Sequence, residues 1–102
     1  MEKARETIVV QVNPIIGDIV DSYLELSNKN VDSLLNALDR GEFDRIKHLA
    51  HDLVGTGGSF GLEDISLIGR SLENAAENRE TEEIKLLVDD LVEYLSLVEI
   101  VY

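Results

Sequence analysis

Apolar residues recur along most of the chain at the three- and four-residue spacing of amphipathic helices. The first stripe follows Pro14 and consists of Ile15, Ile16, Ile19, Val20, Tyr23, Leu24 and Leu26. A polar segment at residues 27–30 predicts a break or kink before a second stripe at Val31, Leu34, Leu35 and Leu38. Further helices are predicted over residues 42–60, around residues 65–76 and from residue 81 onward. Each carries a single apolar stripe, so each is expected to bury one face.

Local signals place the ends of these helices. Pro14 fits a first helical turn with Asn13 as its N-cap, and Thr81 can cap the last helix. Gly41 and Gly61 fit the stops of the helices that precede them. Short connections between amphipathic helices predict an all-α fold, an up-and-down antiparallel four-helix bundle.

The N-terminal segment differs from the rest of the chain. Residues 8–12 have the composition of a strand, but the sequence shows no obvious second strand with which they could pair. We therefore expect residues 1–12 to form a short N-terminal lead-in, followed by one helical bundle domain over residues 13–102.

Composition narrows the possible functions. The 102 residues include 9 basic and 21 acidic side chains, giving a net charge of −12 that should repel nucleic acid and anionic membranes. The absence of cysteine excludes disulfides and thiolate chemistry. No apolar run approaches the roughly 18 residues of a membrane span, and the first residues lack the features of a signal peptide. We expect a soluble, cytoplasmic monomer without nucleic-acid or membrane partners.

The run HDLVGTGGSFG at residues 51–61 places a histidine on a helix whose next turns carry little side chain. Each of Gly55, Gly57 and Gly58 disfavours a helix by about 1 kcal/mol relative to alanine. Together they cost about 3 kcal/mol, a large share of the roughly 5–15 kcal/mol that stabilises a domain. This cost suggests that bare backbone beside His51 lets a large partner approach the imidazole.

Helical geometry separates His51 from the core stripe. With Ile46 at the centre of the buried face, Gly57 falls beside it, whereas His51 falls about 140° away. The exposed side then holds His51 together with Asp44, Lys47, His48, Gly55 and Gly58. An exposed imidazole is largely neutral near pH 7 and has a ring nitrogen able to attack an electrophile. No serine, cysteine or carboxylate pair completes a hydrolytic site, so the histidine is expected to serve another protein.

Residues 50–61, AHDLVGTGGSFG, resemble the motif of histidine-containing phosphotransfer (HPt) domains. That motif is roughly A-H-x-L-K-G, then small residues, a hydrophobic residue and glycine. The similarity extends over Leu62, Ile65, Gly69, the Leu72-Glu73 pair, Ala75-Ala76, residues 14–24 and residues 41–43.

The resemblance implies a phosphorelay carrier of two-component signal transduction. Such a bundle accepts a phosphoryl group on one histidine and exchanges it with the aspartate of a receiver domain in a response regulator or hybrid histidine kinase. It implies a phosphocarrier rather than an enzyme, with no cofactor of its own, because the receiver supplies Mg²⁺ and most catalytic groups.

Carried onto this chain, the resemblance makes His51 the phosphoryl acceptor. The residues expected at the docking surface are Lys47, His48, Val54, Gly55, Thr56 and Gly58. Val54 departs from the family pattern, which usually has a lysine there to steady the anionic phosphoryl group. Lys47, one turn before His51, is expected to substitute in part.

Two alternatives remain open. Because of Val54, the chain could bind a receiver and block it without transferring a phosphoryl group. Less favoured is a helical metal-binding protein, in which His48 and His51 would act with Asp44 or Asp52 as a third ligand.

Overall fold

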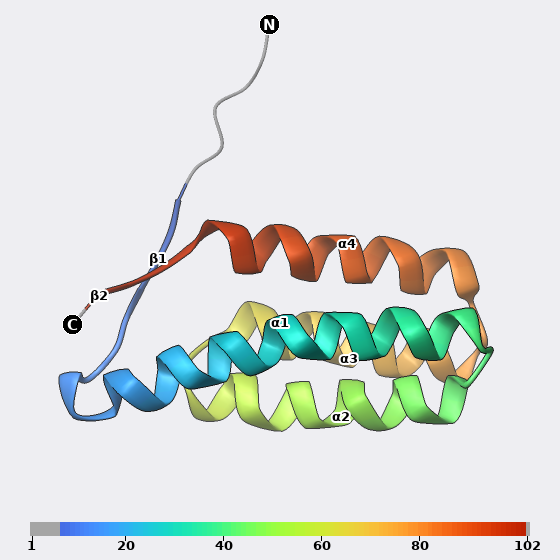
Figure 1. Cartoon of the computed structure of the whole chain (residues 1–102), viewed down its shortest axis with the longest axis horizontal. Coiled ribbons are helices and arrows are strands. Elements are labelled where there is room, and N and C mark those ends of the chain that lie inside the picture. The colour runs from blue at the N-terminus through green and yellow to red at the C-terminus, as the bar shows by residue number, and fades with distance from the viewer. Residues whose placement is uncertain (1–6, 102) are drawn as a thin grey trace, which may run out of the picture.

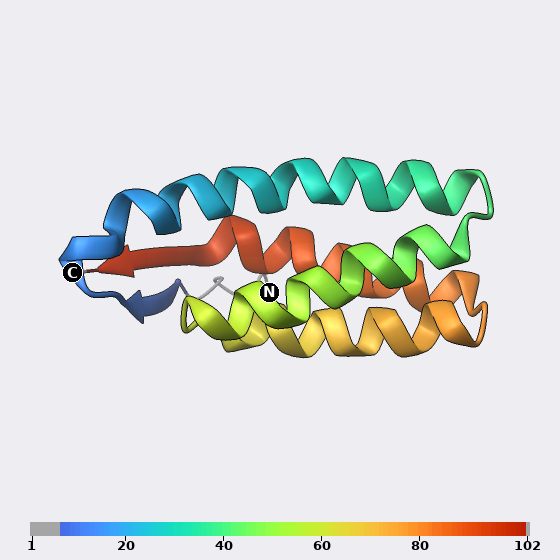
Figure 2. The same cartoon turned by 90° about the horizontal axis from the view of Figure 1, so that it is seen from below.

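A computed structural model describes residues 7–101 and shows helices that run alternately up and down along one long axis (Figures 1 and 2). The four helices are α1 (Gly17–Asp39), α2 (Phe43–Ser59), α3 (Glu63–Glu77) and α4 (Thr81–Leu97). A short 3-10 turn, η1 (Pro14–Ile16), leads into α1. The predicted all-α, up-and-down antiparallel four-helix bundle is confirmed.

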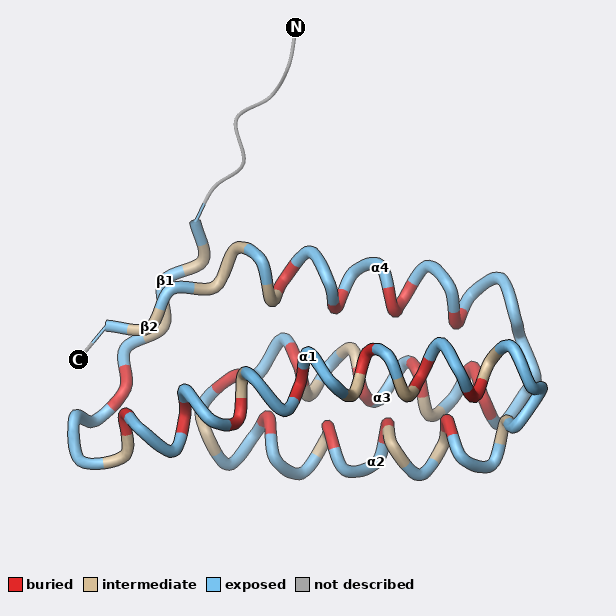
Figure 3. The backbone as a smooth tube through the Cα atoms, viewed as in Figure 1, coloured by how far each residue is buried: buried red, intermediate tan, exposed pale blue. Residues whose placement is uncertain are grey.

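The core lies along the axis of the bundle, where every helix contributes one buried stripe (Figure 3). The largest fully buried apolar side chains are Val20, Leu34, Ile46, Leu53, Leu62, Ile65, Leu72, Ile84, Val88 and Leu91. Burial of each leucine or isoleucine side chain contributes roughly 1.5–3 kcal/mol, so this apolar core is the main source of stability. Within residues 7–101, no helix combines the length and the apolar character needed to cross a membrane.

The sequence predicted a break or kink at residues 27–30; helix α1 is continuous there, so the expectation of a break is wrong. The Ser27 hydroxyl donates to the Tyr23 carbonyl at 2.9 Å, and the Asn28 side-chain amide donates to the Leu24 carbonyl at 3.2 Å. Both side chains bond the carbonyl one turn back along the same helix. These polar residues are therefore accommodated within the helix and do not interrupt it.

The predicted start of the first helical segment and the predicted glycine stops are confirmed. The Asn13 side chain accepts a hydrogen bond from the Ile15 backbone N–H at 3.0 Å, and Pro14 occupies the first turn. Gly41 follows α1 with φ of +66°, and Gly61 follows α2 with φ of +74°. Glycine adopts this left-handed conformation without the steric penalty that a Cβ brings.

The last helix differs from its prediction at both ends. Glu80 occupies the cap position of α4 and forms no side-chain capping bond, while Thr81 is the first residue of the helix; the predicted Thr81 cap is therefore wrong. A helix was predicted from residue 81 onward without a stop, but the helix ends at Leu97 and Val98 begins a strand.

The two ends of the described chain meet in a small parallel sheet. Strand β1 (Ile8–Gln11) pairs with β2 (Val98–Val101) in a register that sets Ile8 opposite Val98 (Figure 1). The sequence showed no partner for residues 8–12, and the structure supplies one from the other terminus. Ile8, Val10, Val98 and Ile100 are partly buried against the core. Residues 1–6 lie outside the described residues, and the domain boundary after residue 12 stays a prediction.

Helices α2 and α3 approach each other closely because two facing positions are glycine. A Cβ at Gly57 would lie 2.8 Å from the Ser66 backbone nitrogen. A Cβ at Gly69 would lie 2.9 Å from the Ala50 oxygen and 3.0 Å from the Val54 nitrogen. Distances this short exclude a side chain at either glycine without movement of the backbone. The seam between α2 and α3 therefore brings the backbone of α3 against the turn of α2 that contains His51.

Candidate functional site

His51 lies in the middle of α2, on the side that its helical position predicts. Its side chain is 71% exposed, while Ala50 and Leu53 on the same turn are buried. The core contacts of α2 hold the helix in place, and His51 is carried on it without being enclosed. The imidazole is therefore accessible to a macromolecular partner.

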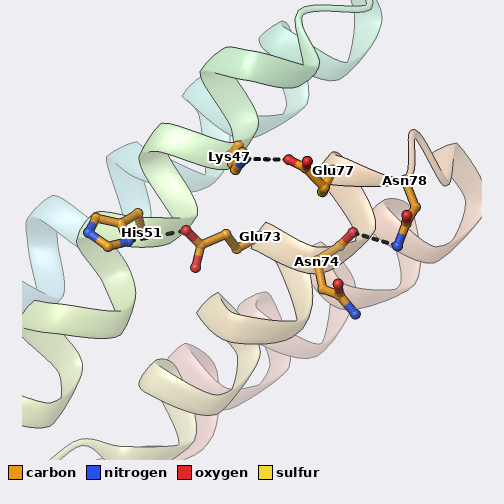
Figure 4. A network of polar contacts seen from close by, with 6 residues as sticks. All are labelled: Lys47, His51, Glu73, Asn74, Glu77 and Asn78. Carbon is orange, nitrogen blue, oxygen red and sulfur yellow. Dashed lines mark hydrogen bonds and ion pairs between the residues drawn. The ribbon is translucent and has the colours of Figure 1, made fainter.

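One ring nitrogen of His51 is held by a carboxylate on the neighbouring helix. The Nδ1 atom lies 3.1 Å from Oε2 of Glu73 on α3 (Figure 4). An ionised carboxylate only accepts hydrogen bonds, so this contact favours the tautomer in which Nδ1 carries the proton. In that tautomer Nε2 has a free lone pair, and Figure 4 shows it on the side of the ring away from Glu73.

Lys47, one turn before His51, forms an ion pair with Glu77 on α3 (Figure 4). The hydrogen bond and the charge of Glu77 raise the pKa of Lys47, and the same contact with Lys47 lowers the pKa of Glu77. The ammonium group is therefore held towards α3. Because Glu77 already offsets its charge, Lys47 is a weaker substitute for the missing lysine than its sequence position suggested.

The imidazole opens into a shallow hollow of about 280 Å³ on the surface of the α2–α3 seam. It is lined by Asp44, Lys47, His48, His51 and Glu73. Four of these were expected on the exposed side of the histidine helix, and the structure adds the Glu73 carboxylate of α3. Among residues 7–101, no three histidine or carboxylate side chains are arranged to hold a metal ion. The described residues therefore give the metal hypothesis no support.

Open backbone follows His51 along α2. A Cβ placed on Gly55 would meet no atom within 4 Å, and one on Gly58 would meet only the Ser66 hydroxyl, at 4.0 Å. Both glycines are exposed, in contrast to Gly57. The two helical turns after the imidazole thus expose backbone without a side chain at Gly55 and Gly58, which leaves room for a large partner to dock.

The other two expected docking residues are engaged within the bundle. The Thr56 hydroxyl lies 2.8 Å from the Tyr23 hydroxyl of α1 and donates to the Asp52 carbonyl at 2.7 Å. Val54 is partly buried, and its carbonyl accepts a hydrogen bond from the Ser66 hydroxyl at 2.8 Å. Thr56 thus joins α2 to α1, and Val54 lies at the seam with α3.

Glu73 is the residue of this site for which the sequence pattern predicted no role. It appeared only within the Leu72-Glu73 pair, 22 positions from His51. A signal was nevertheless present, because Glu73 follows Gly69 by four residues and so lies about 40° from it on the helix. Recognising Gly69 as the point of contact with α2 would have placed Glu73 beside the histidine.

Comparison with known protein families matches residues 18–98 to the Hpt domain. Comparisons with curated proteins and with solved structures gave no significant match. The match covers most of the chain, including His51, Glu73 and all of the four helices except Gly17. Hpt domains serve histidine phosphotransfer in two-component signalling, as phosphocarriers that interact with receiver domains. The chain belongs to the Hpt domain family.

Proposed function

We propose that this protein is a phosphorelay carrier that accepts a phosphoryl group on Nε2 of His51 and exchanges it with the aspartate of receiver domains. One observation supports the proposal above all: the exposed imidazole is held through Nδ1 by Glu73, which leaves Nε2 free beside the open backbone at Gly55. A nucleophile oriented by a second group is the arrangement that group transfer requires.

The transfer step follows from this geometry. The Nε2 lone pair attacks the phosphorus of the receiver's aspartyl phosphate, so that an N–P bond forms and the P–O bond to the aspartate breaks. The electron pair of that bond leaves with the aspartate carboxylate. The ring, now substituted on both nitrogens, carries positive charge, which the Glu73 carboxylate offsets at 3.1 Å from Nδ1. In the reverse direction the aspartate attacks phosphorus and Nε2 departs.

Most catalytic groups for this step come from the partner. In the proposed complex the receiver supplies Mg²⁺, which neutralises the phosphoryl oxygens, and this chain contributes the nucleophile and its orientation. The chain is accordingly a phosphocarrier without a cofactor of its own, and not an enzyme. The proposed partner is the receiver domain of a response regulator or hybrid histidine kinase.

The proposed docking surface surrounds His51 on the exposed side of α2. It comprises Lys47, His48, Val54, Gly55, Thr56 and Gly58. The exposed backbone at the two glycines leaves space for the receiver. Strong negative charge disfavours nucleic acid and anionic membranes as alternative partners. We place this interaction in the cytoplasm, with the carrier acting as a monomer.

A second function is favoured by one specific observation, the valine at position 54. Without a lysine there, the same surface could bind a receiver and occlude its aspartate while transferring nothing. The two functions share the docking surface and differ only in whether His51 becomes covalently modified.

Labelling experiments separate these functions and identify the acceptor. Wild type, His51→Gln and His48→Gln are incubated with radiolabelled phospho-receivers from the same genome. We expect label on wild type and on His48→Gln, which keeps the acceptor, and none on His51→Gln. Label that persists in His51→Gln would contradict the assignment. Receiver binding without label on any form would establish the binding-only function.

A further inference from the structure

We propose that Arg70 on α3 is the cation that contacts the phosphoryl group on His51, in place of the lysine absent from position 54. The inference rests on the proposed carrier function and adds a phosphoryl-binding residue from a different helix. Three observations support it: α3 packs against the turn that contains His51, Lys47 is already paired with Glu77, and a phosphoryl group beside Glu73 needs a cation to offset the repulsion.

The backbone of α3 places residue 70 next to the turn that contains His51. A Cβ on Gly69 would lie 2.9 Å from the Ala50 oxygen and 3.0 Å from the Val54 nitrogen, so residue 69 contacts the backbone on both sides of His51 along α2. Arg70 is the next residue, and its side chain is exposed. Its long side chain therefore starts beside the histidine turn and is free to extend over the surface.

Arg70 also shares a helix flank with Glu73. The two residues are three positions apart, which separates them by about 60° around α3. Glu73 reaches Nδ1 of His51, so Arg70 lies on the same side, nearer to the Gly58 end of α2.

Two hollows on the surface of the α2–α3 seam are consistent with this position of Arg70. Arg70 lines one hollow of about 250 Å³ together with Lys47, Glu73, Asn74 and Glu77. It also lines a second hollow of about 310 Å³ with Gly58, Glu63, Ser66 and Leu67. Arg70 thus lines the surface of the α2–α3 seam next to the hollow at His51, and it shares Lys47 and Glu73 as neighbours with that hollow.

The charges near His51 leave Arg70 as the available cation. Lys47 is paired with Glu77, and residue 54 is uncharged. Within residues 7–101, Arg70 takes part in none of the ion pairs that the structure shows. A phosphoryl group carries about −1.5 to −2 charges, and Glu73 would repel it unless a cation intervenes. The planar fork of an arginine suits two phosphoryl oxygens at once.

The first test removes the charge and measures the lifetime of phosphohistidine without any receiver. Wild type, Arg70→Gln and Arg45→Gln are phosphorylated with phosphoramidate and followed by ³¹P NMR. Arg45 is the matched control, because it is an exposed arginine of α2 whose loss changes the net charge equally. We expect a half-life up to about fivefold shorter in Arg70→Gln, as for an exposed charge pair, and no change in Arg45→Gln.

A second measurement reports contact directly. The Arg70 Nε–H resonance should shift when wild type is phosphorylated, and Val54→Lys introduced into Arg70→Gln should restore the half-life. Equal half-lives in Arg70→Gln and wild type, with no resonance shift, would overturn the role of Arg70 and leave the carrier function intact. A wild type that neither phosphoramidate nor any receiver phosphorylates would overturn both.

Discussion

The two sides of α2 use glycine for opposite purposes. Against α3, a Cβ on Gly57 would lie 2.8 Å from the Ser66 nitrogen; on the solvent side, a Cβ on Gly55 would meet nothing within 4 Å. Each glycine costs a helix about 1 kcal/mol relative to alanine. On the buried side this cost is offset by close packing of the two helices that form the site. On the exposed side the fold gains nothing, so the benefit of Gly55 has to come from a partner.

Gly57→Leu should have the largest effect on stability, because the buried side has no room for a side chain. The new atoms would collide with the Ser66 nitrogen and the Leu62 oxygen, both backbone atoms that cannot rotate away. Overpacking typically costs about 1–3 kcal/mol, and a leucine forced between two backbones should reach or exceed the upper end. Urea unfolding followed by circular dichroism measures the loss.

Gly55→Leu is the matched control for this prediction, since it adds the same side chain two positions earlier. It should be as stable as wild type or more stable by about 0.5–1 kcal/mol, because leucine forms helices better than glycine. If the two variants lost stability equally, the distinction between the two sides of α2 would be wrong.

Gly55→Leu should instead weaken receiver binding. This variant tests whether the exposed glycine gives a receiver access to His51. A leucine one turn after His51 would occupy the surface where the receiver is proposed to dock, and we expect affinity to fall by about tenfold or more, equivalent to 1.4 kcal/mol. Calorimetric titration with the cognate receiver gives the dissociation constant. Ser71→Leu, an added leucine at an exposed position of α3, controls for added apolar surface. Reduced stability with unchanged affinity would contradict an access role.

The features that the sequence predicted well are governed by near neighbours along the chain. Asn13 caps the turn that follows it, and Gly41 and Gly61 adopt positive φ directly after helices. The separation of Gly55 from Gly57 needed only the rotation of about 100° per residue within one helix. The family motif singled out His51 because the histidine and its glycines are contiguous in sequence, and its role as the phosphoryl acceptor stays a prediction.

The features that the sequence did not predict depend on contacts between residues far apart in the chain, or on a choice between competing local hydrogen bonds. The Glu73 contact joins positions 22 apart, and the β1–β2 pairing joins the two ends of the described chain. Neither can be read from spacing, because the packing of whole helices brings these residues together. The false break near Ser27 has a different cause: its hydroxyl bonds a carbonyl of its own helix, an outcome that polarity alone does not reveal.

Val54→Lys should have the smallest effect, and it tests how the exposed side stabilises charge. The substitution places an ammonium group one turn from His51, where it can screen a phosphoryl group of about −1.5 to −2 charges. An interaction between exposed charges contributes about 1 kcal/mol or less, so the transfer rate and phosphohistidine half-life should rise by up to roughly fivefold. Val54→Met, long but uncharged, controls for shape at this partly buried position.

Three outcomes would change this interpretation. If the lysine variant behaves like wild type, the valine is a tolerated variation, and Arg70, Lys47 or the receiver already supplies the charge. If the lysine and methionine variants improve equally, side-chain shape is responsible and the electrostatic explanation fails. If no receiver labels either wild type or Val54→Lys, the exposed side serves binding alone, and the glycines beside His51 admit a receiver that this chain only occludes.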